Sequence, residues 1–580
     1  MKLSFGKYLE LLKKYLMKSK LHLFLLAIVM GFSIIIQLIN PQIVSYFIDG
    51  ISEKKSTKDL IAVAGLFILS ALFGQVLSIG ATYISQNIGW KTTNILRLDL
   101  VKHCLGLDMT FFKEHQSGEI VERIDGDVTA LFNFFSKLLV SFINNILLMI
   151  GIIIIMMVQE FIIGVAFILF LALAFLVIWK TQGKTVEHFG EDRESVSKFY
   201  GFLGEHIEST EDIKSSGADH YVLGRFYEIL RNWLPIRLRA HLSWYKIWIT
   251  LEGIFGIGYV MIFALGGYLM FTHKVTLGVV YLMINYVQLL EKPLEQLKEQ
   301  LLDIQKATAS IIRMEELFAM KSKVENNSNS KIKEDTIRLS VNHVDFEYED
   351  NVPVLRDITF ELEPGKVLGV LGHTGCGKTT LARLLVRFYD PISGGIFINN
   401  NSLTEISSHD LREKIAYVTQ DVQLFMASVR DNITFFDPSI KDSIIIETIY
   451  DMGLKDWYEN LSHGLDTQIK PGGGMSSGEA QLLTLVRVFL KNPKLIILDE
   501  ASSRLDPYTE QLVDKALNKL LIGRSCIIIA HRLGTITRAD DILILDNGSI
   551  LEYGSREALL NKKESKLNQL LNYGISEVLV

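Results

Sequence analysis

Charged residues are distributed very unevenly along the first half of this chain. Five long stretches contain no Asp, Glu, Lys or Arg, namely residues 21–48, 61–90, 138–159, 161–179 and 253–273. Each approaches or exceeds the roughly 20 apolar residues that a helix needs to cross a bilayer core. A sixth uncharged stretch, 275–290, is shorter and follows a tight turn. One such stretch alone is compatible with a buried helix of a soluble protein, but the set favours a membrane domain.

The pattern predicts six membrane-spanning helices in an N-terminal domain that occupies residues 1–320. We expect these helices at about 21–48, 61–90, 132–159, 161–180, 244–272 and 275–297. Three of the links between them are short. The links from about 91 to 131 and from about 181 to 243 are long, charged and helix-like. We therefore expect the helices to continue beyond the bilayer and the chain to turn back near residues 111–123 and 205–217.

The lysines near the N-terminus predict the orientation of this domain. Cytoplasmic segments of membrane proteins have an excess of Lys and Arg. Six lysines precede or begin the first predicted helix: Lys2, Lys7, Lys13, Lys14, Lys18 and Lys20. Three further lysines in the first outer loop, Lys54, Lys55 and Lys58, oppose the rule weakly. An even number of spans then predicts a multi-pass protein of the cell membrane with both termini cytoplasmic.

The remainder of the chain has the composition of a separate globular domain. With 580 residues the chain is too long for one hydrophobic core. Residues 321–335 are polar and are expected to be a linker, so that a second domain occupies residues 336–580. The net charge of −6 offers no basic surface for a nucleic-acid partner. The only cysteines, Cys104, Cys376 and Cys526, are far apart, which argues against a disulfide framework or zinc site.

Residues 372–380, GHTGCGKTT, fit the pattern of a phosphate-binding loop. The three glycines permit a turn in which successive N–H groups point at phosphate oxygens. An apolar strand before the loop and a helical pattern after it place the phosphates at a helix N-terminus. Lys378 is suited to the outer phosphates and the Thr379 hydroxyl to Mg²⁺. The predicted nucleotide-binding residues of the loop are Gly372, His373, Thr374, Gly375, Cys376, Gly377, Lys378, Thr379 and Thr380.

A pair of carboxylates follows a second apolar strand, in the sequence IILDE at residues 496–500. Asp499 is suited to hold Mg²⁺ and Glu500 to polarise the water that attacks a γ-phosphate. The alternative is a carboxylate pair at the surface, which the upstream phosphate loop disfavours. Cys376 within that loop is interpreted as a small filler residue, with a reactive thiol as the alternative.

Five motifs follow one another in an order that resembles an ATP-binding cassette (ABC) domain. They are GHTGCGKT at 372–379, VTQD at 418–421, MSSGE at 475–479, LIILDEASSRLD at 495–506 and IIAHRL at 528–533. With six helices ahead of them, nearly the whole chain resembles the ABC exporter half-transporters. The resemblance implies an all-α six-helix transmembrane domain with long cytoplasmic helical extensions, fused to an α/β P-loop ABC ATPase domain. It also implies ATP and Mg²⁺ as cofactors.

The resemblance implies roles for further residues of the second domain. Tyr348 resembles the aromatic residue that stacks on adenine. Gln420 resembles the glutamine that touches Mg²⁺ and the attacking water, and His531 the histidine that contacts the γ-phosphate. Asp506 resembles the aspartate through which two cassettes meet. The signature residues that would cover the ATP of the opposite cassette are Ser476, Ser477, Gly478 and Glu479.

The signature departs from the family's common Leu-Ser-Gly-Gly-Gln. A side chain at Ser477 is expected to restrict the backbone and to hinder its approach to the γ-phosphate. Glu479 adds a negative charge near the phosphates, and Ala480 and Leu482 stand where basic residues are usual. This combination resembles one member of a heterodimeric exporter, in which only one of two composite sites hydrolyses fast. A homodimer with a tolerated signature is the alternative.

The exporter-like layout implies ATP-driven export of a hydrophobic, amphipathic or peptide substrate by alternating access. A lipid flippase, or an importer that uses the exporter fold, would share the same motifs. Polar residues within the predicted spans are the candidates for cargo binding. They include Glu252, Asn285 and Gln288, of which Glu252 would favour a cationic or amphipathic cargo. An interhelical hydrogen bond is the alternative role for Glu252.

Overall fold

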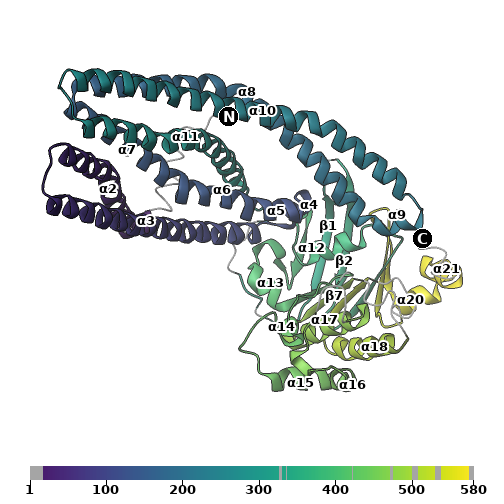
Figure 1. Ribbon diagram of the computed structural model, residues 1–580. Helices are drawn as coiled ribbons and strands as arrows, with labels where there is room; N and C mark the ends of the chain where they lie inside the picture. Colours follow the sequence, from purple (N-terminus) through teal and green to yellow (C-terminus); the bar gives the residue numbers. More distant parts are fainter. Residues whose placement is uncertain are drawn as a thin grey trace. The chain divides into compact units, whose positions relative to one another are not determined.

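The chain divides into two compact units in a computed structural model (Figure 1). The structure describes residues 17–324, 330–332, 334, 336–349, 351–420, 422–469, 475–499, 507–529 and 537–573. One unit comprises Met1–Leu105 and Ser117–Met320, and the other Gly106–Gln116 and Lys321–Val580. The first is helical and the second contains both β-sheets, which confirms the predicted fold class.

Six long helices of the helical unit overlap the six predicted apolar segments. These are α2 (Lys20–Ser52), α3 (Thr57–Leu105), α7 (Leu139–Gln159), α8 (Phe161–Glu208), α10 (Asp219–Phe271) and α11 (Leu277–Ala319). The helices α3, α8 and α10 have 49, 48 and 53 residues. At 1.5 Å per residue each is roughly 70–80 Å long, more than twice the thickness of a bilayer core. The helices therefore continue beyond the apolar segments, as the sequence predicts.

Four helices in the described part of the chain are long and apolar enough to cross a membrane. They are Lys20–Ser52, Thr57–Leu105, Ser117–Gln159 and Asp219–Phe271, and a shorter apolar helix covers Phe161–Val177. The third of these includes α5 (Ser117–Val121), η2 (Glu122–Asp127), α6 (Val128–Asn133) and η3 (Phe134–Leu138) ahead of α7. The sixth predicted span, about 275–297, overlaps the first half of α11.

Close packing joins the helices within their unit. The helices α8 and α10 lie side by side (Figure 1). There Gly258 lets the Phe170 ring approach, because a Cβ at residue 258 would lie 2.7 Å from that ring. Asp49 at the end of α2 accepts hydrogen bonds from Thr276 and from the Gly278 N–H, both at 2.7 Å, and so fixes the start of α11.

Two short helices lie where the chain was predicted to turn back, namely α4 (Met109–Glu114) and α9 (Thr210–Ser215). The first belongs to the sheet-containing unit, although the predicted membrane domain included all residues up to 320. Contacts within that unit explain the difference. Asp108 accepts a hydrogen bond from the Lys323 N–H, and the Lys113 ammonium lies 4.4 Å from the centre of the Tyr348 ring.

The second unit is built on two sheets. The smaller has the order β2-β1-β4-β5 and comprises β1 (Leu339–Glu347), β2 (Pro353–Leu362), β4 (Ser393–Ile398) and β5 (Asn401–Ser402). The larger has the order β10-β9-β3-β8-β7-β6. It comprises β3 (Val367–Leu371), β6 (Ile415–Val418), β7 (Leu495–Asp499), β8 (Ser525–Ile529), β9 (Asp541–Asp546) and β10 (Ser549–Ser555).

Helices cover the larger sheet, whose central strands are parallel. Every residue of β3, β7 and β8 is buried, which explains why these strands are continuous apolar runs in the sequence. Apolar residues of α17 (Ser477–Lys491) and α18 (Pro507–Leu521) form one core, and those of α12 (Lys378–Leu385) belong to another. Ligands of such sheets bind beyond the carboxyl ends of the parallel strands.

Candidate nucleotide site

The predicted phosphate loop connects β3 to α12 in the second unit. Gly372, Gly375 and Gly377 have φ values of 149°, 83° and 107°, which side-chain-bearing residues rarely adopt. A Cβ at residue 372 would lie 2.3 Å from the Leu545 carbonyl oxygen, and one at 377 would lie 2.6 Å from the Leu355 side chain. Neither position has room for a side chain, so the loop depends on these glycines.

The loop holds its lysine tightly. Lys378 is only 6% exposed, and its ammonium donates to the Gly372 carbonyl at 2.7 Å and to the His373 carbonyl at 2.9 Å. Thr379 is partly buried at the start of α12, where the helix dipole favours anions. The next residue, Thr380, accepts a hydrogen bond of 3.2 Å from the Tyr348 hydroxyl. The loop and the predicted adenine-binding tyrosine are thus directly linked.

Cys376 is buried within the loop, with 1% of its surface exposed. Burial raises the pKa of its thiol, although the neighbouring Lys378 ammonium opposes the shift. A raised pKa lowers the fraction of thiolate, which is the reactive form. The structure therefore favours the filler interpretation over the reactive thiol.

Tyr348 lies in an aromatic cluster beside a pocket of about 430 Å³. Its ring meets Phe346 and Tyr389 edge-on, with centroids 4.9 Å and 5.2 Å apart. The Lys113 ammonium lies over the same ring and 3.9 Å from the Glu349 carboxylate. Sequence reasoning missed both Lys113 and Tyr389, because Lys113 lies 235 positions before Tyr348 and no motif links them.

Asp499 ends β7 and is 2% exposed. The parallel register pairs Val418 of β6 with Leu498 of β7, so that the segment after β6 reaches the same sheet edge as Asp499. That segment contains the exposed Gln420. Tyr417, which the motifs did not indicate, donates a hydrogen bond of 3.2 Å to the Asp499 carboxylate. Burial and the nearby carboxylate raise the pKa of Tyr417 well above its usual range, so its hydroxyl remains a donor.

The predicted Mg²⁺ residues provide a set of oxygen donors that fits the ion. Thr379 offers a hydroxyl, Gln420 an amide oxygen and Asp499 a carboxylate. Magnesium usually takes one or two protein carboxylates and completes its shell with water and phosphate oxygens. Among the described residues there is no group of three or more His, Cys, Asp or Glu side chains that could hold a metal ion. Three other predicted residues, Glu500, Asp506 and His531, lie outside the described residues.

The signature residues form the N-terminus of α17. The Ser476 hydroxyl accepts from the Glu479 N–H at 3.2 Å, and the Glu479 carboxylate accepts from the Ser476 N–H at 2.8 Å. This reciprocal pair is a capping box. Ser477 is the first helical residue and its φ is not positive. The side chain of Ser477 therefore fits the helical backbone of this chain, and its expected hindrance of a close approach to the γ-phosphate stays a prediction.

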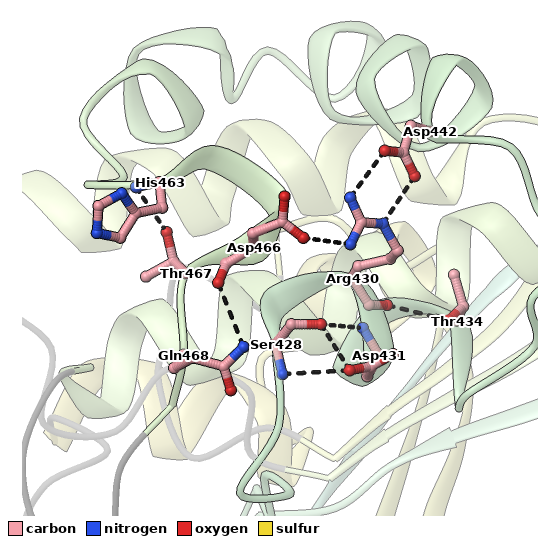
Figure 2. A network of polar contacts seen from close by, with 9 residues as sticks. All are labelled: Ser428, Arg430, Asp431, Thr434, Asp442, His463, Asp466, Thr467 and Gln468. Carbon is pink, nitrogen blue, oxygen red and sulfur yellow. Dashed lines mark hydrogen bonds and ion pairs between the residues drawn. The ribbon is translucent and has the colours of Figure 1, made fainter.

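A polar network joins the segment after Gln420 to the segment before the signature (Figure 2). Arg430 of α14 (Val429–Thr434) binds Asp442 through two hydrogen bonds of 2.8 Å and also contacts Asp466. A backbone hydrogen bond joins the same two segments, since the Val429 N–H donates to the Thr467 carbonyl at 3.0 Å. These hydrogen bonds and ion pairs hold α14 against the segment around Asp466 and Thr467.

The three cargo candidates have different surroundings in the helical unit. Gln288 lines a cavity of about 630 Å³. Asn285 is partly buried and donates to the Tyr281 carbonyl of its own helix at 3.2 Å. Glu252 is exposed on α10 and does not line that cavity. Of these three candidates, Gln288 is the one among the described lining residues of this cavity.

Comparisons with known proteins agree with both units. The family described as "ABC transporter transmembrane region" matches residues 23–294, and the family described as "ABC transporter" matches residues 355–503. The "Putative ABC transporter ATP-binding protein exp8" of Streptococcus pneumoniae is 28% identical and covers 91% of this chain and 90% of its own. A "Putative multidrug export ATP-binding/permease protein" of Staphylococcus aureus is 29% identical and covers 96% and 97%.

A solved structure has the same fold. The structure titled "Structure of a bacterial Atm1-family ABC exporter with ATP bound" superposes with a TM-score of 0.78 and covers 96% of this chain and 97% of its own. Its sequence identity is 22%, so this likeness concerns the fold alone.

Proposed function

The chain is an ATP-hydrolysing transporter of the ABC exporter type, with the transmembrane and ATPase domains in one polypeptide, and from this premise we propose how it works. ATP closes between two cassettes, and its hydrolysis resets a membrane domain that exports a cargo by alternating access. The observation that carries this proposal is the glycine-dependent phosphate loop around Lys378, in the same chain as helices long and apolar enough to span a membrane.

Each residue of the nucleotide site has a proposed task. The loop N–H groups and Lys378 bind the phosphates, and Tyr348 stacks on adenine. Thr379, Gln420 and Asp499 would hold Mg²⁺, which neutralises charge that develops on the phosphates. Tyr417 orients the Asp499 carboxylate through its hydrogen bond. Glu500 polarises the attacking water, and His531 contacts the γ-phosphate.

We propose that both termini and the ATPase unit are cytoplasmic. The lysines before the first span support this orientation. It places the turn between α2 and α3 outside the cell and α9 inside.

We further propose that the chain works with a different half-transporter. The chain has the phosphate loop, Asp499 and Glu500 that its own nucleotide site requires. Its signature, which would contact the ATP bound to the opposite cassette, is altered at Ser477 and Glu479. The Glu479 carboxylate adds negative charge where phosphate must bind. A partner with the common signature would then complete the active site that contains Lys378. A homodimer is the alternative.

ATPase measurements on the purified chain in lipid vesicles test these proposals. The wild-type chain with its partner should hydrolyse ATP, and Glu500→Gln should abolish nearly all of that activity while ATP still binds. The chain without a partner should hydrolyse ATP slowly. Fast, cargo-stimulated hydrolysis by the chain alone would contradict the heterodimer but not the transporter. ATP-driven accumulation inside inverted vesicles establishes the direction as export.

A further inference from the structure

A cavity of about 630 Å³ in the helical unit has a strongly polar lining. It lies between α2, α3, α7 and α11 and includes the residue Ser136 of η3. Of its 19 described lining residues, 12 have hydroxyl or amide side chains and 6 are apolar. Its volume is in the range of small-molecule sites, whose linings are usually mostly apolar. A cavity that only separated helices, or that held a lipophilic cargo, would not need so many polar groups.

Six of the polar groups are carboxamides, each with both donor and acceptor atoms. They are Gln37, Gln86, Asn144, Asn145, Gln288 and Gln296. Asn145 donates to Gln296 at 3.0 Å and Gln37 donates to Ser33 at 3.3 Å, which fixes their orientations. Each carboxamide has further donor and acceptor capacity after one hydrogen bond, so these side chains can also bind a ligand. Polar groups within a membrane domain are costly, and they typically mark a water-filled cavity or substrate pathway.

Lys292 is the one charged residue among the described lining residues. It is exposed, and no ion pair involves it in the part of the chain that the structure describes. Glu291 and Glu295 are near it in sequence but do not line the cavity. The charge within the lining is therefore positive. This differs from the expectation of a cationic cargo, which depended on Glu252, because Glu252 does not line the cavity.

In three of the helices, a lining residue lies at a similar distance from the helix end on the same side of the membrane domain. Gln37 lies 15 residues before the end of α2, Asn145 lies 14 before the end of α7, and Lys292 lies 15 after the start of α11. These separations correspond to about 21–23 Å along each helix. In the proposed orientation they place the cavity in the cytoplasmic half of a core about 30 Å thick. A water-soluble cargo could then enter from the cytoplasm.

We propose that this cavity binds the cargo and that the cargo is a small, polar organic anion. The carboxamides hydrogen-bond its polar groups and Lys292 binds its carboxylate or phosphate. This inference rests on the proposed function of the chain as an exporter, and it narrows the cargo class. A peptide with a free carboxylate fits it, whereas a lipophilic cation does not.

Two dyes with the same xanthene skeleton test the charge preference. The full-length chain, with its partner if it has one, is placed in vesicles with the ATPase facing out. We measure ATP-driven uptake and binding of anionic 5-carboxyfluorescein and cationic rhodamine 123. The anion should bind and accumulate. Lys292→Gln should raise the half-saturating concentration of the anion about tenfold, since a charge-assisted hydrogen bond is lost.

Matched variants separate the effect of this lysine from a general loss of charge. Lys306→Gln removes a lysine from the same helix that does not line the cavity, and it should leave uptake unchanged. Asn145→Leu should weaken binding of the anion as well, because it removes an amide and leaves Gln296 without this donor.

Each outcome has a distinct meaning. If neither ATP hydrolysis nor uptake of any dye occurs, the proposed function fails. If the cation alone is taken up and Lys292→Gln has no effect, the exporter stands and the anion inference is overturned. The inference is also overturned if ATP is hydrolysed but 5-carboxyfluorescein neither binds nor accumulates.

Discussion

At the residue scale, the Tyr417–Asp499 hydrogen bond adds a residue to the site that the motifs do not contain. Tyr417→Phe removes only the hydroxyl that donates to the buried carboxylate. We expect the Mg²⁺ concentration for half-maximal ATPase activity to rise about tenfold, as is typical when a partner of a metal ligand is lost. Mg²⁺ titrations of the variant measure this. Tyr450→Phe, on the exposed face of α15 (Asp442–Asp451), is the control. An unchanged Mg²⁺ requirement would show that Tyr417 has only a packing role.

The buried thiol of Cys376 makes a second prediction at this scale. Since its pKa is raised and 1% of its surface is exposed, the thiolate needed for alkylation is scarce and shielded. We expect N-ethylmaleimide at neutral pH to leave the ATPase activity unchanged for minutes. The reagent should modify Cys104, Cys376 and Cys526 only after denaturation, because all three are buried. Rapid inactivation that Cys376→Ser prevents would contradict this expectation.

At the element scale, the capping box at the start of α17 explains how the variant signature remains compatible with a stable helix. Glutamine can replace glutamate in such a box, whereas alanine cannot accept from the Ser476 N–H. We expect Glu479→Ala to cost about 1 kcal/mol, which lowers the melting temperature by about 2–4 °C. Glu479→Gln should leave it nearly unchanged.

Thermal unfolding of both variants and the wild type, in the presence and absence of ATP, measures the two effects. Equal destabilisation by Gln and Ala would mean that the carboxylate charge, rather than the cap, supports the helix.

Elements that depend on local pattern were predictable from the sequence, and those that depend on distant contacts were not. The apolar segments of α2 and α3 and the strand–loop–helix around Lys378 follow from periodicity and glycine spacing. The place of α4 in the ATPase unit does not, because it depends on contacts between Lys113 and Tyr348. Similarly, no local signal links Gln37 to Gln296. Their common cavity depends on how four helices pack.

At the scale of the whole molecule, the orientation in the membrane determines from which side the cavity can be loaded. The three native cysteines are buried, so a cysteine introduced at the surface can be labelled with little labelling of the others. Ser52 at the end of α2 and Ser216 after α9 are both exposed and suit this purpose. We expect a membrane-impermeant maleimide to label Ser52→Cys in intact cells and Ser216→Cys only after permeabilisation.

The two positions test each other, since the proposed topology places the end of α2 and the end of α9 on opposite sides of the membrane. The six lysines before and at the start of α2 predict that the side of the membrane with Ser216 is cytoplasmic. The three lysines after α2 weakly favour the opposite orientation. The inverse labelling pattern would show that the second group prevails. The cavity would then lie nearer the outside, and its Lys292 could no longer meet a cytoplasmic anion before ATP is bound.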